Sequence, residues 1–150
     1  MNEEARKRAL RLLEKRDYSR KMLLDKLTEK GVPGDDAAEV ADWLCETGLV
    51  NDARYAELIV RHYAMKGYGQ RRICDELYRR GIARELWEEA LSAAPETDGT
   101  VYKLLSGRLR GSDGSPEDIR KAQSYLLRRG YSWEEIRSAL EQYQVSEDKQ

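Results

Sequence analysis

Three stretches of the sequence decide the fold: Leu27-Thr28-Glu29-Lys30-Gly31-Val32, Leu77-Tyr78-Arg79-Arg80-Gly81-Ile82 and Leu126-Leu127-Arg128-Arg129-Gly130-Tyr131. Each has the form Leu-x-x-basic-Gly-apolar. This form is typical of a helix end, where glycine takes a positive φ angle and the next apolar residue folds back on the last turn. One copy would carry little information because such endings are common. The three glycines lie about 50 residues apart, however, and a near-constant period predicts an internal repeat.

Helical periodicity fills the chain around these stretches. Apolar residues recur at the i, i+3, i+4 spacing, and strand alternation appears nowhere over any length. Ser19 is a candidate cap of the second helix. The last two helices are each predicted to begin at a capping sequence, at residues 115–118 and 132–135. The sequence therefore predicts an all-α fold of nine helices with no sheet. Three-helix units bury apolar faces partly against their neighbours, so we expect an elongated array of three tandem repeats. The expected repeats are 1–50, 51–94 and 95–150, the last with a short polar C-terminal tail.

The composition excludes several classes of protein. The chain has 150 residues, of which 40% are hydrophobic and 37% charged, so it can bury a core and full disorder is not expected. No apolar run approaches the roughly 20 residues that a membrane span requires. The N-terminal segment mixes both signs of charge, unlike a secretory signal. We expect a cytoplasmic protein that makes no contact with a membrane.

Motifs for catalysis or metal binding are sparse. Cys45 and Cys74 lie in separate segments, and we expect both thiols to be buried rather than to bind zinc or form a disulfide. The single histidine, His62, is expected to pack on the apolar flank of its helix, beside Leu58 and Tyr63. No strand precedes the Gly-x-Gly at 67–69, so a dinucleotide fingerprint is not indicated. The sequence predicts no catalytic residues, no metal and no cofactor.

Basic residues are the more informative feature. The segment 61–84 holds seven of them against two acids, Asp75 and Glu76. Those acids are expected to pair with Arg79 and Arg80 one turn later. With Ile73, Cys74, Leu77 and Tyr78 inward, a helical wheel points Arg72 and Arg79 to solvent. No acid precedes the following residues by one turn: Lys66, Arg71, Arg72, Arg128 and Arg129.

Two interpretations of these cations stay open. They are either an ordinary solvated face or a surface for an anionic partner, and the lack of acidic neighbours favours the second. Tyr68, which lies between two glycines, either presents its ring to that partner or packs over its own turn.

Several of these runs also resemble the bacterial RecX regulatory proteins: 16–20, 48–55, 66–73 and 126–131. The resemblance extends from about residue 5 to residue 143. Two family motifs are matched, one by Asp52, Arg54 and Tyr55, the other by Lys66, Gly67, Tyr68, Gly69 and Ile73. The chain has no Phe, so tyrosine stands at positions where the family often has Phe or Tyr.

The resemblance implies a non-enzymatic modulator of the RecA recombinase. RecX-like proteins bind the RecA–single-stranded-DNA filament along its helical groove and usually suppress strand exchange, ATP hydrolysis and the co-protease activity of the SOS response. The implied partner is the RecA filament, with single-stranded DNA reached through it, and the chain is expected to act as a monomer. The expected contact residues are Lys66, Tyr68, Arg71, Arg72, Arg128 and Arg129. Asp52 and Arg54 have a structural alternative, as a helix cap and as an ion-pair partner of Glu57.

Two other functions remain open at this stage. Short Arg-faced helices after glycine turns are compatible with direct DNA binding, although the formal net charge of −1 disfavours strong autonomous binding to a duplex. A helical scaffold for an unrelated protein is the other alternative.

Overall fold

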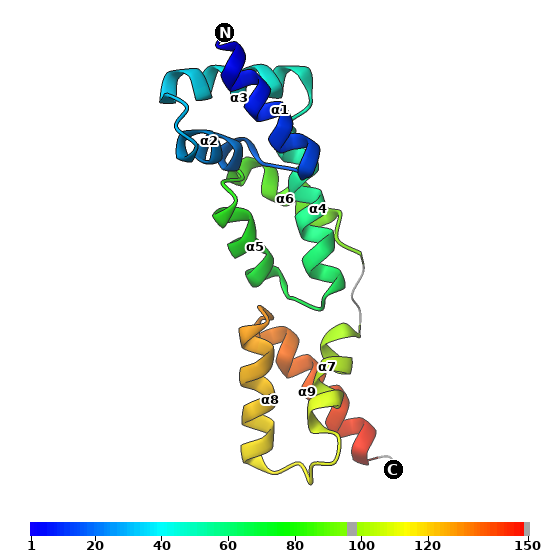
Figure 1. Cartoon of the computed structure of the whole chain (residues 1–150). Helices are drawn as coiled ribbons and strands as arrows, with labels where there is room; N and C mark the ends of the chain where they lie inside the picture. Colours follow the sequence, from blue (N-terminus) through cyan, green and yellow to red (C-terminus); the bar gives the residue numbers. More distant parts are fainter. Residues whose placement is uncertain (96–98, 149–150) are drawn as a thin grey trace. The chain divides into compact units, whose positions relative to one another are not determined.

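The computed structural model describes residues 1–95 and 99–148. Over these residues the chain forms nine α-helices, one short 3₁₀ helix and no strand (Figure 1). The α-helices are α1 (Glu3–Lys15), α2 (Arg20–Glu29), α3 (Gly34–Thr47), α4 (Asp52–Met65), α5 (Gln70–Arg79), α6 (Trp87–Ser92), α7 (Thr100–Leu109), α8 (Pro116–Arg128) and α9 (Trp133–Asp148). The 3₁₀ helix, η1 (Arg84–Leu86), precedes α6. The predicted all-α class is confirmed, and the expected polar tail is helical as far as Asp148.

The helices divide into two compact units. Unit 1 comprises Met1–Ile59 and Glu76–Ala93, and unit 2 comprises Val60–Asp75 and Ala94–Gln150. In unit 1, α1, α2 and α3 pack together around a core that includes Leu23, Leu27 and Leu44. In unit 2, α7 packs on α8 and α9 around Leu105, Leu126 and Ile136. The division passes through α4 and α5, so both helices contribute residues to each unit.

The three repeated helix ends have the predicted conformation. Gly31, Gly81 and Gly130 have φ angles of +93°, +74° and +99°. In each case the amide of the following residue donates to the carbonyl of the leucine five residues earlier, at 3.0, 3.1 and 3.2 Å. All three leucines of the motif are fully buried, and the following apolar residues are 4–7% exposed. The repeat is therefore a recurring Schellman ending whose apolar residue closes the last turn of its helix.

The predicted caps are also present. The Ser115 hydroxyl accepts from the amide of Asp118 at 3.2 Å, with Pro116 in the first turn. At α9, Ser132 and Glu135 exchange hydrogen bonds, each accepting at 3.0–3.1 Å from the other's backbone amide. This reciprocal pair satisfies amides that the helix itself leaves without acceptors. In contrast, α3 begins at Gly34, after Pro33, without a side-chain cap.

The predicted packing of Leu58 and His62 on the inward face of α4 is wrong. Leu58 is 47% exposed and His62 is also exposed, with its ring edge-to-face against Tyr63 at 5.1 Å. The residues that the helix buries are Tyr55, Ala56, Val60 and Ala64. The buried residues are displaced by about one position from the predicted ones, because small alanine side chains let the helix pack closely. A periodicity judged by large apolar side chains favours Leu and Tyr instead. The cysteine prediction also needs correction, since Cys45 is exposed and Cys74 half-buried.

No helix in the described part of the chain combines the length and the apolar character needed to cross a membrane.

Candidate functional site: a glycine junction with a basic surface

The motif at 66–69 links the end of α4 to the start of α5. Gly67 has a φ of +85°, and its amide donates to the carbonyl of Ala64 at 3.0 Å. The amide of Tyr68 donates to the carbonyl of Tyr63 at 3.1 Å, as in the repeated helix ends. Lys66 therefore leaves the helix immediately before a fixed turn, and its side chain is exposed.

In unit 2 this turn lies against the turn between α8 and α9. The amide of Gly69 donates to the carbonyl of Arg129 at 2.7 Å, and the amide of Arg71 donates to the carbonyl of Gly130 at 3.2 Å. The first turn of α5 thus finds acceptors for its amides in a segment about 60 residues away. We call residues 66–71 and 129–131 the glycine junction.

The junction is also closed by side chains. The carbonyl of Gly67 accepts from the Nε of Arg129 at 3.1 Å and from the hydroxyl of Tyr131 at 2.6 Å. Arg129 donates through Nη2 to the carbonyl of Lys66 as well. Tyr131 is 4% exposed, and this burial raises the pKa of its phenol, although the nearby Arg129 guanidinium acts in the opposite direction.

Two glycines are required by the closeness of the two turns. A Cβ at Gly69 would lie 2.5 Å from the carbonyl carbon and oxygen of Gly130. A Cβ at Gly130 would lie 2.5 Å from the amide nitrogen of Arg72, at a φ angle that L-residues rarely adopt. Gly69, which the sequence placed in a family motif, therefore has a structural role.

The ring of Tyr68 packs over its own turn. The guanidinium carbons of Arg129 and Arg72 lie 4.2 and 5.1 Å from its centroid, and Tyr63 contacts it edge-on at 5.7 Å. Tyr68, Arg72 and Arg129 are all half-buried. Stacking of this kind holds planar guanidinium groups in place. The ring of Tyr68 thus packs against guanidinium groups while it stays partly exposed, and Arg72, predicted to point straight to solvent, is half-buried.

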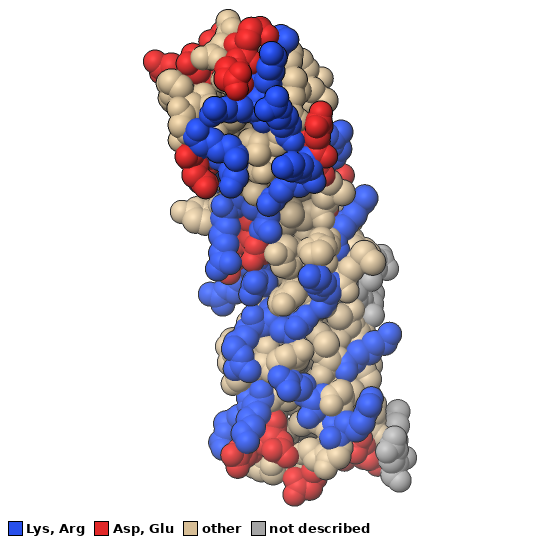
Figure 2. Space-filling view, in the orientation of Figure 1, with Lys and Arg blue, Asp and Glu red and all other residues tan. Residues whose placement is uncertain are grey.

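The remaining predicted contact residues, Lys66, Arg71 and Arg128, have exposed side chains in unit 2. Basic side chains are prominent over α8 in the space-filling view (Figure 2). Arg71 lines a cavity of about 620 Å³ together with Gln70, Cys74 and Trp133. Trp133 is 54% exposed, although its place in the sequence indicates only a capping sequence. An exposed Trp beside an exposed Arg is the combination that dominates binding energy in many protein interfaces.

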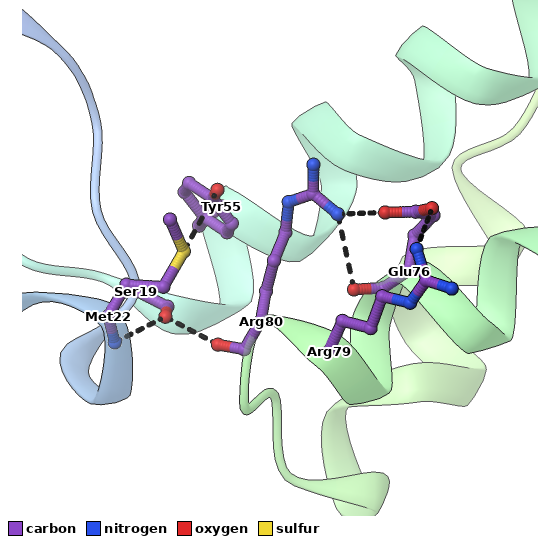
Figure 3. Close-up of polar contacts among 6 residues, drawn as sticks. All are labelled: Ser19, Met22, Tyr55, Glu76, Arg79 and Arg80. Carbon is purple, nitrogen blue, oxygen red and sulfur yellow. Dashed lines mark hydrogen bonds and ion pairs between the residues drawn. The ribbon is translucent and has the colours of Figure 1, made fainter. Parts of the chain in front are cut away.

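The other family motif, at 52–55, is structural in unit 1. Asp52 accepts from the backbone amide of Arg20, the first residue of α2, at 2.8 Å, beside the N-cap Ser19. Its own helix is capped by Asn51, which accepts from the amide of Arg54. The hydroxyl of Tyr55 lies 3.4 Å from the sulfur of Met22, and Tyr55 is 8% exposed (Figure 3). Arg54 is exposed. Ile73, from the second motif, is buried.

A buried carboxylate in unit 1 corrects the predicted wheel of α5. Glu76 is 4% exposed, whereas Tyr78, expected inward, is 72% exposed. Arg80 pairs with Glu76 as predicted, and Arg79 lies 3.5 Å from the same carboxylate instead of pairing with Asp75 (Figure 3). The carbonyl of Arg80 in turn accepts from the hydroxyl of Ser19 at 2.5 Å. Burial of Glu76 is tolerated because two guanidinium groups compensate its charge.

Among residues 1–95 and 99–148, no three His, Cys, Asp or Glu side chains are grouped so as to hold a metal ion. Although Cys45 is exposed as a residue, partial desolvation of its thiol, and then the Asp52 carboxylate, raise the thiol pKa, which lowers the fraction of reactive thiolate at neutral pH. The arrangement that remains is a closed backbone junction with exposed cations around it.

Comparison with known proteins identifies the family. Three family models match in succession: the first three-helix domain of RecX at residues 5–44, the second at 51–91 and the third at 96–140. The regulatory protein RecX of Chromohalobacter salexigens is 37% identical over 133 residues, covering 88% of both chains. That of Halorhodospira halophila is 35% identical over 141 residues, covering 92% of this chain and 87% of its own. The crystal structure of RecX from Lactobacillus salivarius superposes with a TM-score of 0.83 at 25% identity, over 95% of this chain and 96% of that one. The chain, with its three tandem three-helix domains, belongs to the RecX family of regulatory proteins.

Proposed function

We propose that this protein regulates the RecA recombinase by binding its filament on single-stranded DNA, without catalysing a reaction itself. The binding surface comprises the exposed cations of the glycine junction, Lys66 and Arg71, together with Arg128 and Trp133. The effect is suppression of strand exchange, ATP hydrolysis and co-protease activity, and it takes place in the cytoplasm. Membership of the RecX family supports this proposal, and so does the match of the motifs at 52–55 and 66–73 to those of the family.

The observation that carries the proposal is the division of roles within one motif. Gly67, Tyr68 and Gly69 fix the backbone through the contacts described above, whereas the side chains of Lys66 and Arg71 extend from that backbone into solvent. A rigid backbone reduces the entropy lost when exposed side chains bind a partner. Arg suits acidic protein surfaces and phosphates alike.

The proposed mechanism is differential binding. A ligand shifts an equilibrium only by the difference between its affinities for the two states. The protein therefore suppresses RecA activity by binding more tightly to a filament state that does not extend or hydrolyse ATP.

The test is a titration of RecA ATP hydrolysis on single-stranded DNA with the wild-type chain and with a Lys66→Ala/Arg71→Ala variant. If both cations are desolvated on the filament, the loss is about 1–3 kcal/mol, and the half-inhibitory concentration rises roughly 5- to 150-fold. A Lys103→Ala/Arg137→Ala variant is the matched control, because it removes two exposed cations of unit 2 outside the junction. An unchanged inhibition curve for the junction variant contradicts the assignment of the surface. Absence of inhibition by the wild type at saturation contradicts the function itself and favours the scaffold.

A further inference from the structure

A hollow between α7 and α8 in unit 2 has the character of an anion site. It has a volume of about 910 Å³ and lies beside the loop that joins the two helices. Its lining includes five cationic side chains, Arg108, Arg110, Arg120, Lys121 and Arg128, against two acidic ones. Only Arg128 among them belongs to the surface proposed above.

The charges in this hollow are incompletely neutralised. Within residues 1–95 and 99–148, Arg110 and Arg120 are exposed and have no carboxylate within ion-pair distance. Lys121 pairs with Glu117 at 3.5 Å, and Asp118 accepts from the hydroxyl of Ser112 at 2.6 Å. The two acids of the hollow are thus engaged by Lys121 and Ser112, and the guanidinium groups are left to a ligand.

One guanidinium is held in place by an aromatic ring. The carbon of the Arg108 guanidinium lies 3.7 Å from the centroid of Tyr125, on α8. A contact of this kind restrains the guanidinium group against the ring. The hollow therefore combines an Arg held against a ring with exposed ones, Arg110, Arg120 and Arg128.

The cations are distributed along a line. Arg120, Ser124 and Arg128 follow one another at intervals of four residues on α8, so they lie on one helical face. At about 1.5 Å per residue, this face extends over roughly 12 Å from Arg120 to Arg128. A single small anion would occupy one point of such a line, whereas a chain of phosphates would occupy its length.

The lining also distinguishes a nucleic acid from a protein partner. Of the described residues that line the hollow, Ala122 alone has an apolar side chain. Protein interfaces centre on apolar and aromatic anchors in desolvated pockets, whereas protein–nucleic acid interfaces are more polar and strongly positive. We infer that the α7–α8 hollow binds the phosphodiester backbone of a nucleic-acid strand through Arg108, Arg110, Arg120 and Arg128, and that it does so without RecA.

The test is the anisotropy of a fluorescein-labelled 20-nucleotide oligo(dT), titrated with the chain alone between 50 and 200 mM salt. The Arg110→Ala/Arg120→Ala variant is compared with the Lys103→Ala/Arg137→Ala control, which removes the same charge outside the hollow. For single strands the slope of log K against log salt changes by about 0.7 for each phosphate that the protein neutralises, so the double variant should reduce it by about 1.4. Over this salt range the affinity of the wild type should therefore fall roughly sevenfold more than that of the variant. The control should keep the slope of the wild type.

Two results overturn the inference. One is an equal change in the slope of log K against log salt in the variant and in the control, which would mean that the cations of the hollow act only through the net charge of the chain. The other is competition by a 20-residue polyglutamate as strong as that by unlabelled oligo(dT), which would assign the hollow to acidic peptides. Circular dichroism verifies that each variant retains the helical content of the wild type. These measurements contain no RecA. A loss of oligo(dT) binding can therefore be distinguished from a loss of RecA inhibition.

Discussion

Replacement of Gly69 by alanine tests the closure of the glycine junction directly. The added Cβ would lie 2.5 Å from the carbonyl carbon and oxygen of Gly130 and 2.7 Å from the amide nitrogen of Tyr131. These are backbone atoms, so no side chain can rotate away. Gly69 also lacks a positive φ, which means that alanine brings no conformational strain of its own. The close approach alone is therefore responsible for any effect.

The cost follows from the two hydrogen bonds that the added methyl group disrupts. To reach an ordinary separation of about 3.4 Å, the two turns must move apart by about 0.9 Å. Such a shift weakens the bonds from the Gly69 and Arg71 amides, now 2.7 and 3.2 Å long. Each contributes about 0.5–1.5 kcal/mol, and overpacking adds a further 1–3 kcal/mol. We expect Gly69→Ala to lower the free energy of unfolding by about 2–4 kcal/mol, and Tm by roughly 4–16 °C.

Gly107→Ala provides the matched control. Gly107 lies inside α7 in the same unit, and a Cβ there would have no atom within 4 Å. Alanine is favoured over glycine in a helix by about 0.5–1 kcal/mol, so this variant should be slightly more stable than the wild type. Urea unfolding followed by circular dichroism measures both changes. Exchange of the amide hydrogens of residues 69 and 71, the two junction donors, measured by NMR, reports whether the loss is located at the junction.

The reasoning is refuted if Gly69→Ala costs less than about 0.5 kcal/mol, the usual range of surface substitutions. It is also refuted if Gly107→Ala is destabilising to the same degree, because the close approach to Gly130 would then not be the cause.

Two further predictions concern the same pair of turns. Tyr131→Phe removes the hydrogen bond from the Tyr131 hydroxyl to the Gly67 carbonyl, but that carbonyl still accepts from Arg129. We therefore expect the free energy of unfolding in urea at pH 7 to fall by about 1 kcal/mol. Burial raises the pKa of the Tyr131 phenol above its ordinary value of 10.0, so the phenol is deprotonated in the unfolded chain at a lower pH than in the folded chain. The stability advantage of Tyr131 over Phe should therefore disappear as the pH rises above 10. A stability advantage that persists above that pH contradicts the burial of the phenol at the junction. Ser132→Ala removes the acceptor for the Glu135 amide at the start of α9 and should cost about 1 kcal/mol. An equally large loss in Ser138→Ala, at an exposed position inside the same helix, would show that capping is not the cause.

The sequence predicted what depends on local chemistry. Helix ends at Gly31, Gly81 and Gly130 follow from glycine's access to positive φ and from the apolar residue after it, so they could be found without any knowledge of tertiary packing. The same holds for the caps at Ser115 and Ser132, whose hydrogen-bond partners lie within three residues.

The junction between 66–71 and 129–131 could not be predicted in this way. Its bonds join residues about 60 positions apart, and nothing in either turn alone indicates the acceptors that the other provides. Packing also decided the inward faces of α4 and α5, where alanines and a paired Glu76 replaced the Leu and Tyr that periodicity favoured.

The cations of the α7–α8 hollow, by contrast, were within reach of the sequence. Arg108, Arg110 and Arg120 have Leu104, Ser106 and Pro116 four residues before them, so no acid stands at that spacing. Trp133 was obscured by its place in a capping sequence, which explains the backbone but not the exposed ring.

The glycine junction thus contains two kinds of residue, those that hold its backbone and those whose side chains stay exposed. Gly69 and Gly130 permit the close approach of two turns, and Arg129 directs its donors to the carbonyls of Gly67 and Lys66. A charge committed to the backbone contributes little to a partner, because binding would have to break bonds that already satisfy it. Arg129 can therefore be necessary for function without contacting a partner, by holding the turn from which Lys66 and Arg71 extend. Loss of Arg129 should consequently reduce both stability and binding, whereas loss of Lys66 or Arg71 should reduce binding alone.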